Sequence, residues 1–164
     1  ANQTIETIKP SDWHSTINLN LTSHQQLLTS AHDFLVHGCR PSVVIVGSKN
    51  VPAPGPGVAA YSAAKAGLTQ LARVAALEWG KHGIKVNTVH PNAVFDTSIW
   101  SDEQIASRAA HYGMSIGEYQ SRNVLKTEIT SDKVAELILV MTGSAFDCTT
   151  GAQIPIDGGN DRVI

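Results

Sequence analysis

The sequence predicts an α/β fold in which helices cover both faces of a parallel, doubly wound sheet. Three short runs rich in β-branched residues are the candidate strands, at 42–48, 84–89 and 152–156. Longer stretches with helical spacing separate them, and strands that alternate with helices are typical of βαβ units. The first run is apolar almost throughout, as expected for a strand that is covered on both faces.

The helices are predicted from their apolar spacing and from the residues at their ends. Ser11 offers a capping oxygen before Asp12, so we expect the first helix to begin there and to end at Gly38. An alanine-rich helix follows from Val58 to Trp79, after a loop with three prolines. The remainder is expected to form a loop at 92–100, a helix from 101, a polar stretch at 114–129, a helix at 131–141 and the last strand.

The composition indicates one globular domain over residues 1–164. With 42% apolar residues, a chain of 164 residues is long enough for one core. The net charge of −2 provides no basic field for nucleic acid or anionic lipid. The two cysteines stand far apart, no apolar run is long enough to span a membrane, and no histidines have metal-ligand spacing. We therefore expect a cytoplasmic protein that acts on a small molecule and has no metal site.

The residues that carry chemistry are Ser48, Tyr61 and Lys65. Tyr61 and Lys65 are four residues apart on a predicted helix, so they share one face. A neighbouring ammonium favours an ionised phenolate, which makes Tyr61 a competent general acid/base for a hydroxyl or carbonyl group. Ser48 ends a strand, and catalytic groups of open α/β sheets gather at the carboxyl ends of strands. Without this context the Tyr–Lys pair is weak evidence, because a solvated pair has the same spacing.

Four segments in the right order resemble the short-chain dehydrogenase/reductase family. They are the Ser48–Tyr61–Lys65 set, W-H-S-T-I-N-L-N-L at 13–21, V-N-T-V-H-P at 86–91, and the segment at 150–159 that ends in D-G-G. The resemblance covers nearly the whole chain. It implies the C-terminal portion of a Rossmann-like doubly wound parallel sheet, without the N-terminal βαβ half that binds the nucleotide.

The resemblance also implies a role for each site residue. Tyr61 would exchange a proton with the substrate oxygen, and Ser48 would orient the substrate carbonyl. Lys65 would assist Tyr61 and bind the ribose of NAD or NADP, while Asn20 would hold a water that connects Lys65 to solvent. The cofactor would supply the hydride. The residues expected to contact it are Tyr61, Lys65, Pro91, Asn92, Ala93 and Val94.

Three positions depart from the family pattern. Asn92 replaces the glycine that usually follows Pro91, and asparagine tolerates left-handed backbone better than most residues. Asp96 stands where a threonine is usual, and Gly47 where a serine is frequent. The departures resemble the dehydrogenase half of bifunctional rhamnulose-phosphate aldolase/short-chain dehydrogenase proteins, which implies carbohydrate catabolism and a small sugar-derived substrate. The segments that carry this likeness are 90–97, 99–100, 108–113, 122–128 and 158–164.

Other signals have plainer interpretations. The segment 55–60 fits G-x-G-x-x-G/A, but a dinucleotide loop should follow its strand directly, and six residues intervene here. We interpret it as the loop that delivers Tyr61. For His90, a packing or hydrogen-bonding role is favoured over a catalytic one. For Arg108, His111 and Tyr112, substrate contact and a solvated helix face are equally compatible with the sequence.

The sequence contains no T-G-x-x-x-G-x-G loop to receive a pyrophosphate and begins without methionine. We therefore expect a fragment of a longer enzyme, with cofactor binding weakened or lost and little activity in isolation. The open edge of the 42–48 strand would pair with the missing N-terminal half. The alternative is a non-catalytic oligomerisation or binding module. In either case we expect a homo-oligomer formed through the helices near 12–37 and 58–79.

Overall fold

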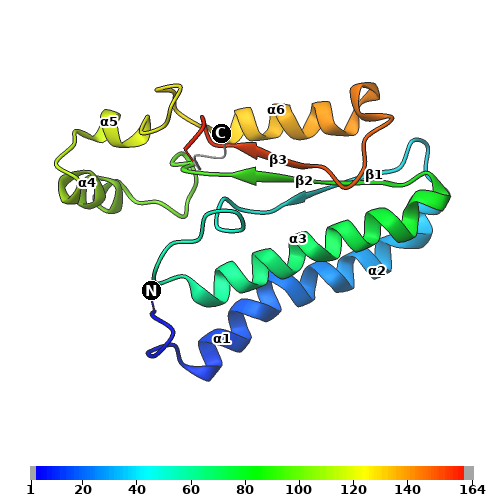
Figure 1. The fold of residues 1–164 in the computed structure, drawn as a ribbon, viewed down its shortest axis with the longest axis horizontal. Helices are drawn as coiled ribbons and strands as arrows, with labels where there is room; N and C mark the ends of the chain where they lie inside the picture. Colours follow the sequence, from blue (N-terminus) through cyan, green and yellow to red (C-terminus); the bar gives the residue numbers. More distant parts are fainter. Residues whose placement is uncertain (1–2, 161–164) are drawn as a thin grey trace.

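The computed structural model describes residues 3–160, and the structure within that range has a parallel three-stranded sheet. The strands are β1 (Ser42–Val46), β2 (Lys85–Pro91) and β3 (Gln153–Ile156), in the order β1-β2-β3. Strand β2 lies in the centre and is buried from its first residue to His90. The predicted α/β class and parallel sheet are thus confirmed (Figure 1).

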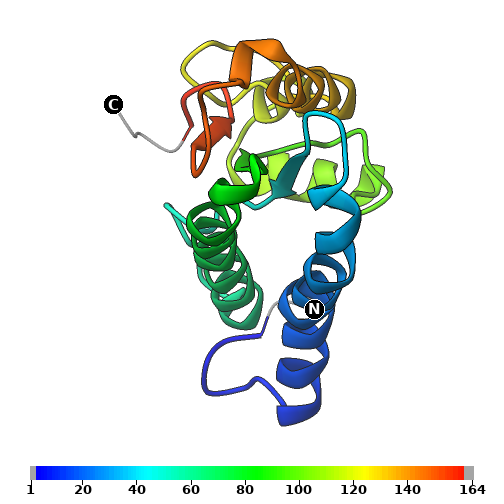
Figure 2. The same ribbon diagram turned by 90° about the vertical axis from the view of Figure 1, so that its right-hand side faces the viewer.

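Helices cover both faces of this sheet. Helix α3 packs on one face, with α1 and α2 against it, and α6 packs on the other (Figures 1 and 2). Helices α4 and α5 lie beyond the carboxyl ends of the strands (Figure 1). The helical elements are α1 (Pro10–Ile17), η1 (Asn18–Thr22), α2 (Ser23–Val36), α3 (Ala59–Trp79), η2 (Gly80–His82), α4 (Asp102–His111), α5 (Ile116–Gln120), α6 (Ser131–Thr142) and η3 (Ser144–Phe146).

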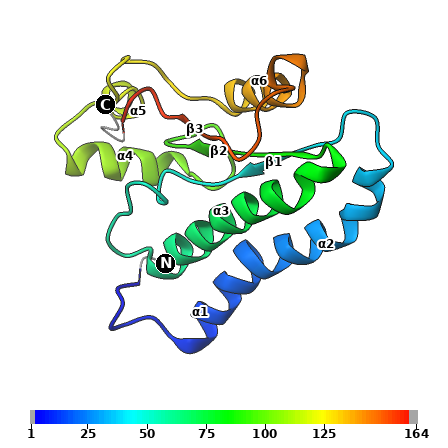
Figure 3. The ribbon, with the colours of Figure 1, turned by 45° about the vertical axis from the view of Figure 1, so that its right-hand side comes forward.

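The first predicted helix is a continuous run of three elements, α1, η1 and α2 (Figure 3). Its middle element, η1, is a π-helix, a form that occurs mostly as short bulges and is frequent at functional sites. The run begins at Pro10, and Lys9 is extended before it, so the predicted cap at Ser11 is wrong. The reason is that proline suits the first helical position and holds the preceding residue out of the helical region.

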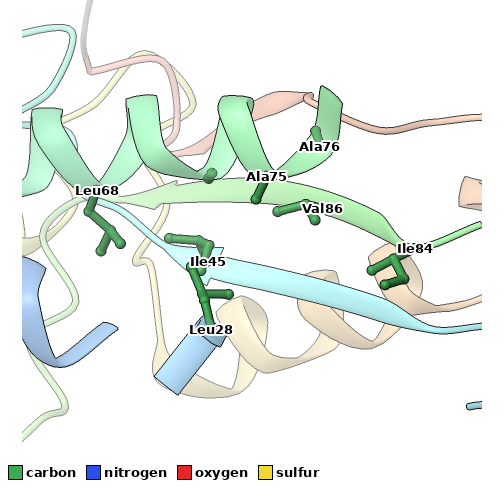
Figure 4. Packing of buried hydrophobic residues seen from close by; sticks show 8 residues of the cluster. Leu28, Ile45, Leu68, Ala75, Ala76, Ile84 and Val86 are labelled. Atoms are coloured by element: carbon green, nitrogen blue, oxygen red, sulfur yellow. The ribbon is translucent and has the colours of Figure 1, made fainter. Parts of the chain in front are cut away.

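The core lies between the sheet and the α2–α3 pair (Figure 4). Leu68 and Val86 are completely buried there, and Leu28 reaches Ile45 from α2. The alanines of α3 allow this helix to approach β2 closely, because a methyl group is the smallest apolar side chain. The buried members of the cluster are Leu28, Ile45, Leu68, Ala72, Ala75, Ala76, Ile84 and Val86.

The short helix α5 lies in the segment predicted only as polar. Ser115 accepts a hydrogen bond from the Glu118 amide, and the Glu118 carboxylate accepts one from the Ser115 amide. This S-x-x-E capping box was readable in the sequence as a helix start. No helix within residues 3–160 is long and apolar enough to cross a membrane.

Candidate active site

Ser48 lies two residues beyond β1, at the carboxyl edge of the sheet. The ladder continues past the strand, because the Gly47 amide donates to the Val89 carbonyl at 2.8 Å and the Lys49 amide donates to the Pro91 carbonyl at 3.1 Å. The Ser48 side chain is buried, and its hydroxyl oxygen accepts from the Asn50 amide at 3.1 Å. The hydroxyl proton therefore stays available for another oxygen.

Lys65 brings a buried ammonium group to the same edge. Its side chain extends from α3 toward the sheet, is only 8% exposed, and donates from Nζ to the Val46 carbonyl at 3.0 Å. Burial lowers the pKa of Lys65, since removal from water disfavours the charged form. The ammonium has three N–H groups, so two remain for further acceptors.

Tyr61 lies one turn before Lys65, in the first turn of α3. The Lys65 Nζ is 5.8 Å from the centroid of the Tyr61 ring, so the expected proximity of the two groups is present. The ring is half-buried. Its hydroxyl has no hydrogen-bond partner within residues 3–160, which leaves it free to meet a substrate oxygen.

Asn20 belongs to the π-helix η1, which packs against α3. Its amide donates to the Thr16 carbonyl at 3.1 Å, and no direct bond joins it to Lys65 in the described part of the chain. His24 lies one turn further along the helix. Partial burial lowers the pKa of His24, and the positive charge of Lys65 lowers it further. His24 was missed in the sequence, although its spacing of four from Asn20 places both on one helix face.

The expected cofactor loop begins where β2 ends. The Asn92 amide donates to the Ile156 carbonyl at 3.2 Å, and Pro91 is the last residue of the strand. Ala93, with φ 55°, adopts the left-handed conformation that the sequence suggested for Asn92. Asn92 instead keeps its side-chain Nδ2 buried without a partner within residues 3–160. Val94 continues the loop and pairs with Ile129 in an isolated parallel bridge.

Asp96, which stands in place of the usual threonine, has a structural role. Its carboxylate accepts from the Ser131 amide at 2.9 Å and from the Ser131 hydroxyl at 2.8 Å. These hydrogen bonds lower the pKa of Asp96. Ser131 is the first residue of α6, so Asp96 anchors the start of that helix.

An aromatic cluster beyond the strand ends is formed by the loop before α4, the residue that ends α4, and α5. Phe95 contacts both Trp100 and Tyr119, with ring centroids 5.1 and 5.4 Å apart. Two arginines lie over this cluster, Arg108 at 4.9 Å from the Trp100 ring and Arg122 at 4.2 Å from the Tyr112 ring. The guanidinium groups thus stabilise the cluster by cation–π contact.

The structure therefore gathers Tyr61, Lys65 and the β1 end at one edge, with the Asn92 loop at the end of the neighbouring strand. A tyrosine hydroxyl, an ammonium with spare donors and a serine hydroxyl can together move a proton to or from an oxygen.

Comparisons with known proteins identify relatives of this chain. The sequence profile of a family described as enoyl-(acyl carrier protein) reductase matches residues 1–161. An uncharacterized oxidoreductase of Bacillus subtilis, YuxG, is 37% identical over 154 residues, which are 90% of this chain and 22% of that protein. An uncharacterized NAD-dependent oxidoreductase of Mycobacterium tuberculosis is 29% identical over 148 residues, 90% of this chain and 54% of that protein.

The fold is also shared with solved structures. A short chain dehydrogenase from Mycobacterium paratuberculosis bound to NAD has 26% sequence identity and a TM-score of 0.81, over 99% of this chain and 60% of that one. The chain thus spans about half the length of the Mycobacterium tuberculosis relative and less than a quarter of the Bacillus relative.

Proposed function

The chain belongs to the short-chain dehydrogenase/reductase family, and we propose that it supplies the proton-transfer centre of an NAD(P)-dependent oxidoreductase. The observation that carries this proposal is the buried Lys65 ammonium, which is bonded to the Val46 carbonyl two residues before Ser48 and lies 5.8 Å from the Tyr61 ring centroid. Lys65 as a residue is only 8% exposed; burying an ammonium is costly, and perturbed cations cluster at functional sites.

The proposed reaction interconverts a hydroxyl and a carbonyl. In oxidation Tyr61 accepts the hydroxyl proton of the substrate, and in reduction it returns that proton to the carbonyl oxygen. The Ser48 hydroxyl donates to the same oxygen, and Lys65 lies beside Tyr61, with Nζ 5.8 Å from the ring centroid. Asn20 would hold the water through which Lys65 exchanges protons with solvent. When bound, the cofactor accepts or donates the hydride.

The residues of the chain suit the nicotinamide end of such a cofactor. Lys65 has two unused N–H donors for ribose hydroxyls, and the buried Asn92 Nδ2 is a donor without a partner within residues 3–160. Pro91, Ala93 and Val94 complete the loop in which Asn92 lies. The NAD-dependent Mycobacterium tuberculosis relative supports a nicotinamide cofactor in general, and either NAD or NADP is compatible with these residues.

The proposed substrate is small and derived from a sugar, as in the rhamnulose-phosphate aldolase/short-chain dehydrogenase proteins. In keeping with this, the Bacillus relative is much longer than this chain, because the match covers only 22% of it. The alternative of a non-catalytic module has no support from the relatives, which are described as oxidoreductases.

The test uses the protein expressed from its full coding sequence. Short hydroxyaldehydes, sugar alcohols and their phosphates are offered with NAD or NADP, and reduced nicotinamide is followed by its absorbance. The expected result is turnover that Ser48→Ala lowers by about 10²-fold or more. No turnover across the panel with either nucleotide, while the nucleotide binds in calorimetry, would contradict the proposed reaction.

Assembly through the long helices is a second part of the proposal. Phe34 on α2 and Leu77 on α3 are more than 80% exposed, and Leu27 is 67% exposed. Large apolar side chains on two adjacent helices suit a symmetric contact with a second copy. Strand β1 is one of the two edge strands of the described sheet, and a preceding βαβ half of the same protein would cover it. Light scattering of Leu77→Lys against the unchanged protein tests the helix contact, which predicts a smaller species for the variant.

A further inference from the structure

His90 lies at the end of β2 and is buried, with 4% of its surface exposed. Its ring contacts the segment that carries Ser48. The Nδ1 atom is 3.2 Å from the Ser48 amide nitrogen and 3.0 Å from the Ser48 carbonyl oxygen. On the other side of the ring, Nε2 is 2.7 Å from the side-chain oxygen of Gln153 on β3.

The neighbouring groups decide which ring nitrogen carries the proton. The Ser48 carbonyl already accepts from the Val51 amide at 3.1 Å. Within residues 3–160 the Ser48 amide donates to the His90 Nδ1 atom, and no main-chain carbonyl accepts from it. A buried N–H without an acceptor is costly, so Nδ1 must offer its lone pair. The proton then sits on Nε2, which donates to the Gln153 oxygen.

Gly47 leaves the room that this ring occupies. A Cβ atom at position 47 would lie 2.6 Å from the His90 Nδ1 atom and 2.7 Å from its Cε1 atom. Real Cβ atoms do not approach heavy atoms so closely, and the ring is held on both sides, so it cannot swing away without losing its hydrogen bonds. The glycine at 47 and the histidine at 90 are therefore mutually dependent.

We propose that His90, in its Nε2–H form, is a positioning residue that fixes Ser48 through its backbone amide, and that Gly47 is required for this contact. Three successive amides, those of 47, 48 and 49, are then bonded to β2, the middle one through the ring. The inference goes beyond the proposed function by assigning the device that orients the serine. It rests on that function only in taking Ser48 to contact the substrate.

The test compares two amide substitutions in the protein expressed from its full coding sequence. In His90→Asn, the side-chain oxygen is attached to Cγ, as Nδ1 is, so the acceptor for the Ser48 amide is kept. In His90→Gln, the amide group lies one carbon further out, near the position of Nε2, so that acceptor is lost. The two variants have similar polarity and serve as matched controls for each other.

The first readout is independent of catalysis. Hydrogen exchange of the Ser48 amide, followed by NMR, is expected to be about tenfold or more faster in His90→Gln than in the unchanged protein, and little altered in His90→Asn. The nitrogen-15 spectrum of labelled histidine is expected to show a protonated Nε2 and an unprotonated Nδ1. Equal exchange rates in all three proteins, or a proton on Nδ1, would overturn the inference.

The second readout is the rate. His90→Gln is expected to lower kcat by about tenfold with little change in KM, and to add no further loss in a Ser48→Ala background, because His90 acts through Ser48. Gly47→Ala should lower kcat by about as much as His90→Gln. This loss of kcat should be smaller when His90→Ala removes the ring. If the protein shows no oxidoreductase activity at all, the proposed function fails, and the exchange and nitrogen-15 measurements still decide the role of His90.

Discussion

Replacement of Tyr61 by phenylalanine is the sharpest test of the proposed chemistry, because it separates catalysis from stability. The Tyr61 hydroxyl makes no hydrogen bond within residues 3–160, and its ring is only half-buried. Phenylalanine keeps the ring and removes an oxygen with no protein partner, so we expect the free energy of unfolding to change by less than about 0.5 kcal/mol. The general acid/base is lost, so kcat/KM should fall by about 10²–10⁴, equivalent to about 3–5 kcal/mol of transition-state stabilisation.

The assay combines turnover of the full-coding-sequence protein with calorimetric unfolding of the same samples. The matched control is Tyr119→Phe, at a ring that packs on Phe95 with centroids 5.4 Å apart. This control should leave the rate and the unfolding temperature unchanged. The reasoning is refuted if Tyr61→Phe retains the rate to within about threefold. A parallel loss of stability would instead assign Tyr61 a packing role.

Three further predictions concern charge and backbone. Burial lowers the pKa of Lys65 in the folded protein below 10.5, so between these two pKa values only the unfolded chain binds the proton. The free energy of unfolding should therefore decrease as the pH falls from above 10.5 through the lowered pKa. Lys65→Met should lack this decrease in denaturant titrations over the same pH range. Hydrogen bonds from Arg40 and Lys85 lower the pKa of Asp147, so their stabilisation should be present above pH 3.8 and disappear in more acidic solution. Asp147→Asn should show a smaller loss of stability in acid than the unchanged protein. Ala93→Gly should raise the free energy of unfolding by about 0.5 kcal/mol. The glycine removes about 1–2 kcal/mol of left-handed backbone strain, while the greater conformational entropy of the unfolded chain costs about 0.5–1 kcal/mol. An unfolding temperature below that of the unchanged protein would contradict this prediction.

The elements of the fold were predictable wherever burial alone sets the pattern. Strand β1 reads as a nearly continuous apolar run, while the alanines of α3 mark a helix that packs closely on the sheet. The helix start at Pro10 was misplaced because two valid signals, a proline and a serine, stood side by side. Helix α5 was missed because its capping box lies among polar residues, where apolar periodicity is weak.

The site was predictable only as far as local spacing reaches. The interval of four residues places Tyr61 and Lys65 on one face of α3, and the structure has them there. The bond from Lys65 to the Val46 carbonyl joins residues nineteen positions apart, and nothing in the sequence specifies it. The same holds for His90 and Ser48, which are 42 positions apart. Contacts of this kind depend on how distant segments align in the fold, and residue spacing along the sequence does not specify that alignment.

Two departures from the family pattern, Asp96 and Gly47, each have a distant partner in the structure. Asp96 gave up a hydroxyl but gained two hydrogen bonds from Ser131, so the loop after β2 is tied to α6. Gly47 gave up a side chain but admits the His90 ring, which accepts the otherwise unsatisfied Ser48 amide. In both cases one residue change makes sense only with its distant partner. A reversion at one member alone, such as Gly47→Ser with His90 in place, should therefore impair the protein more than the same reversion made together with His90→Ala.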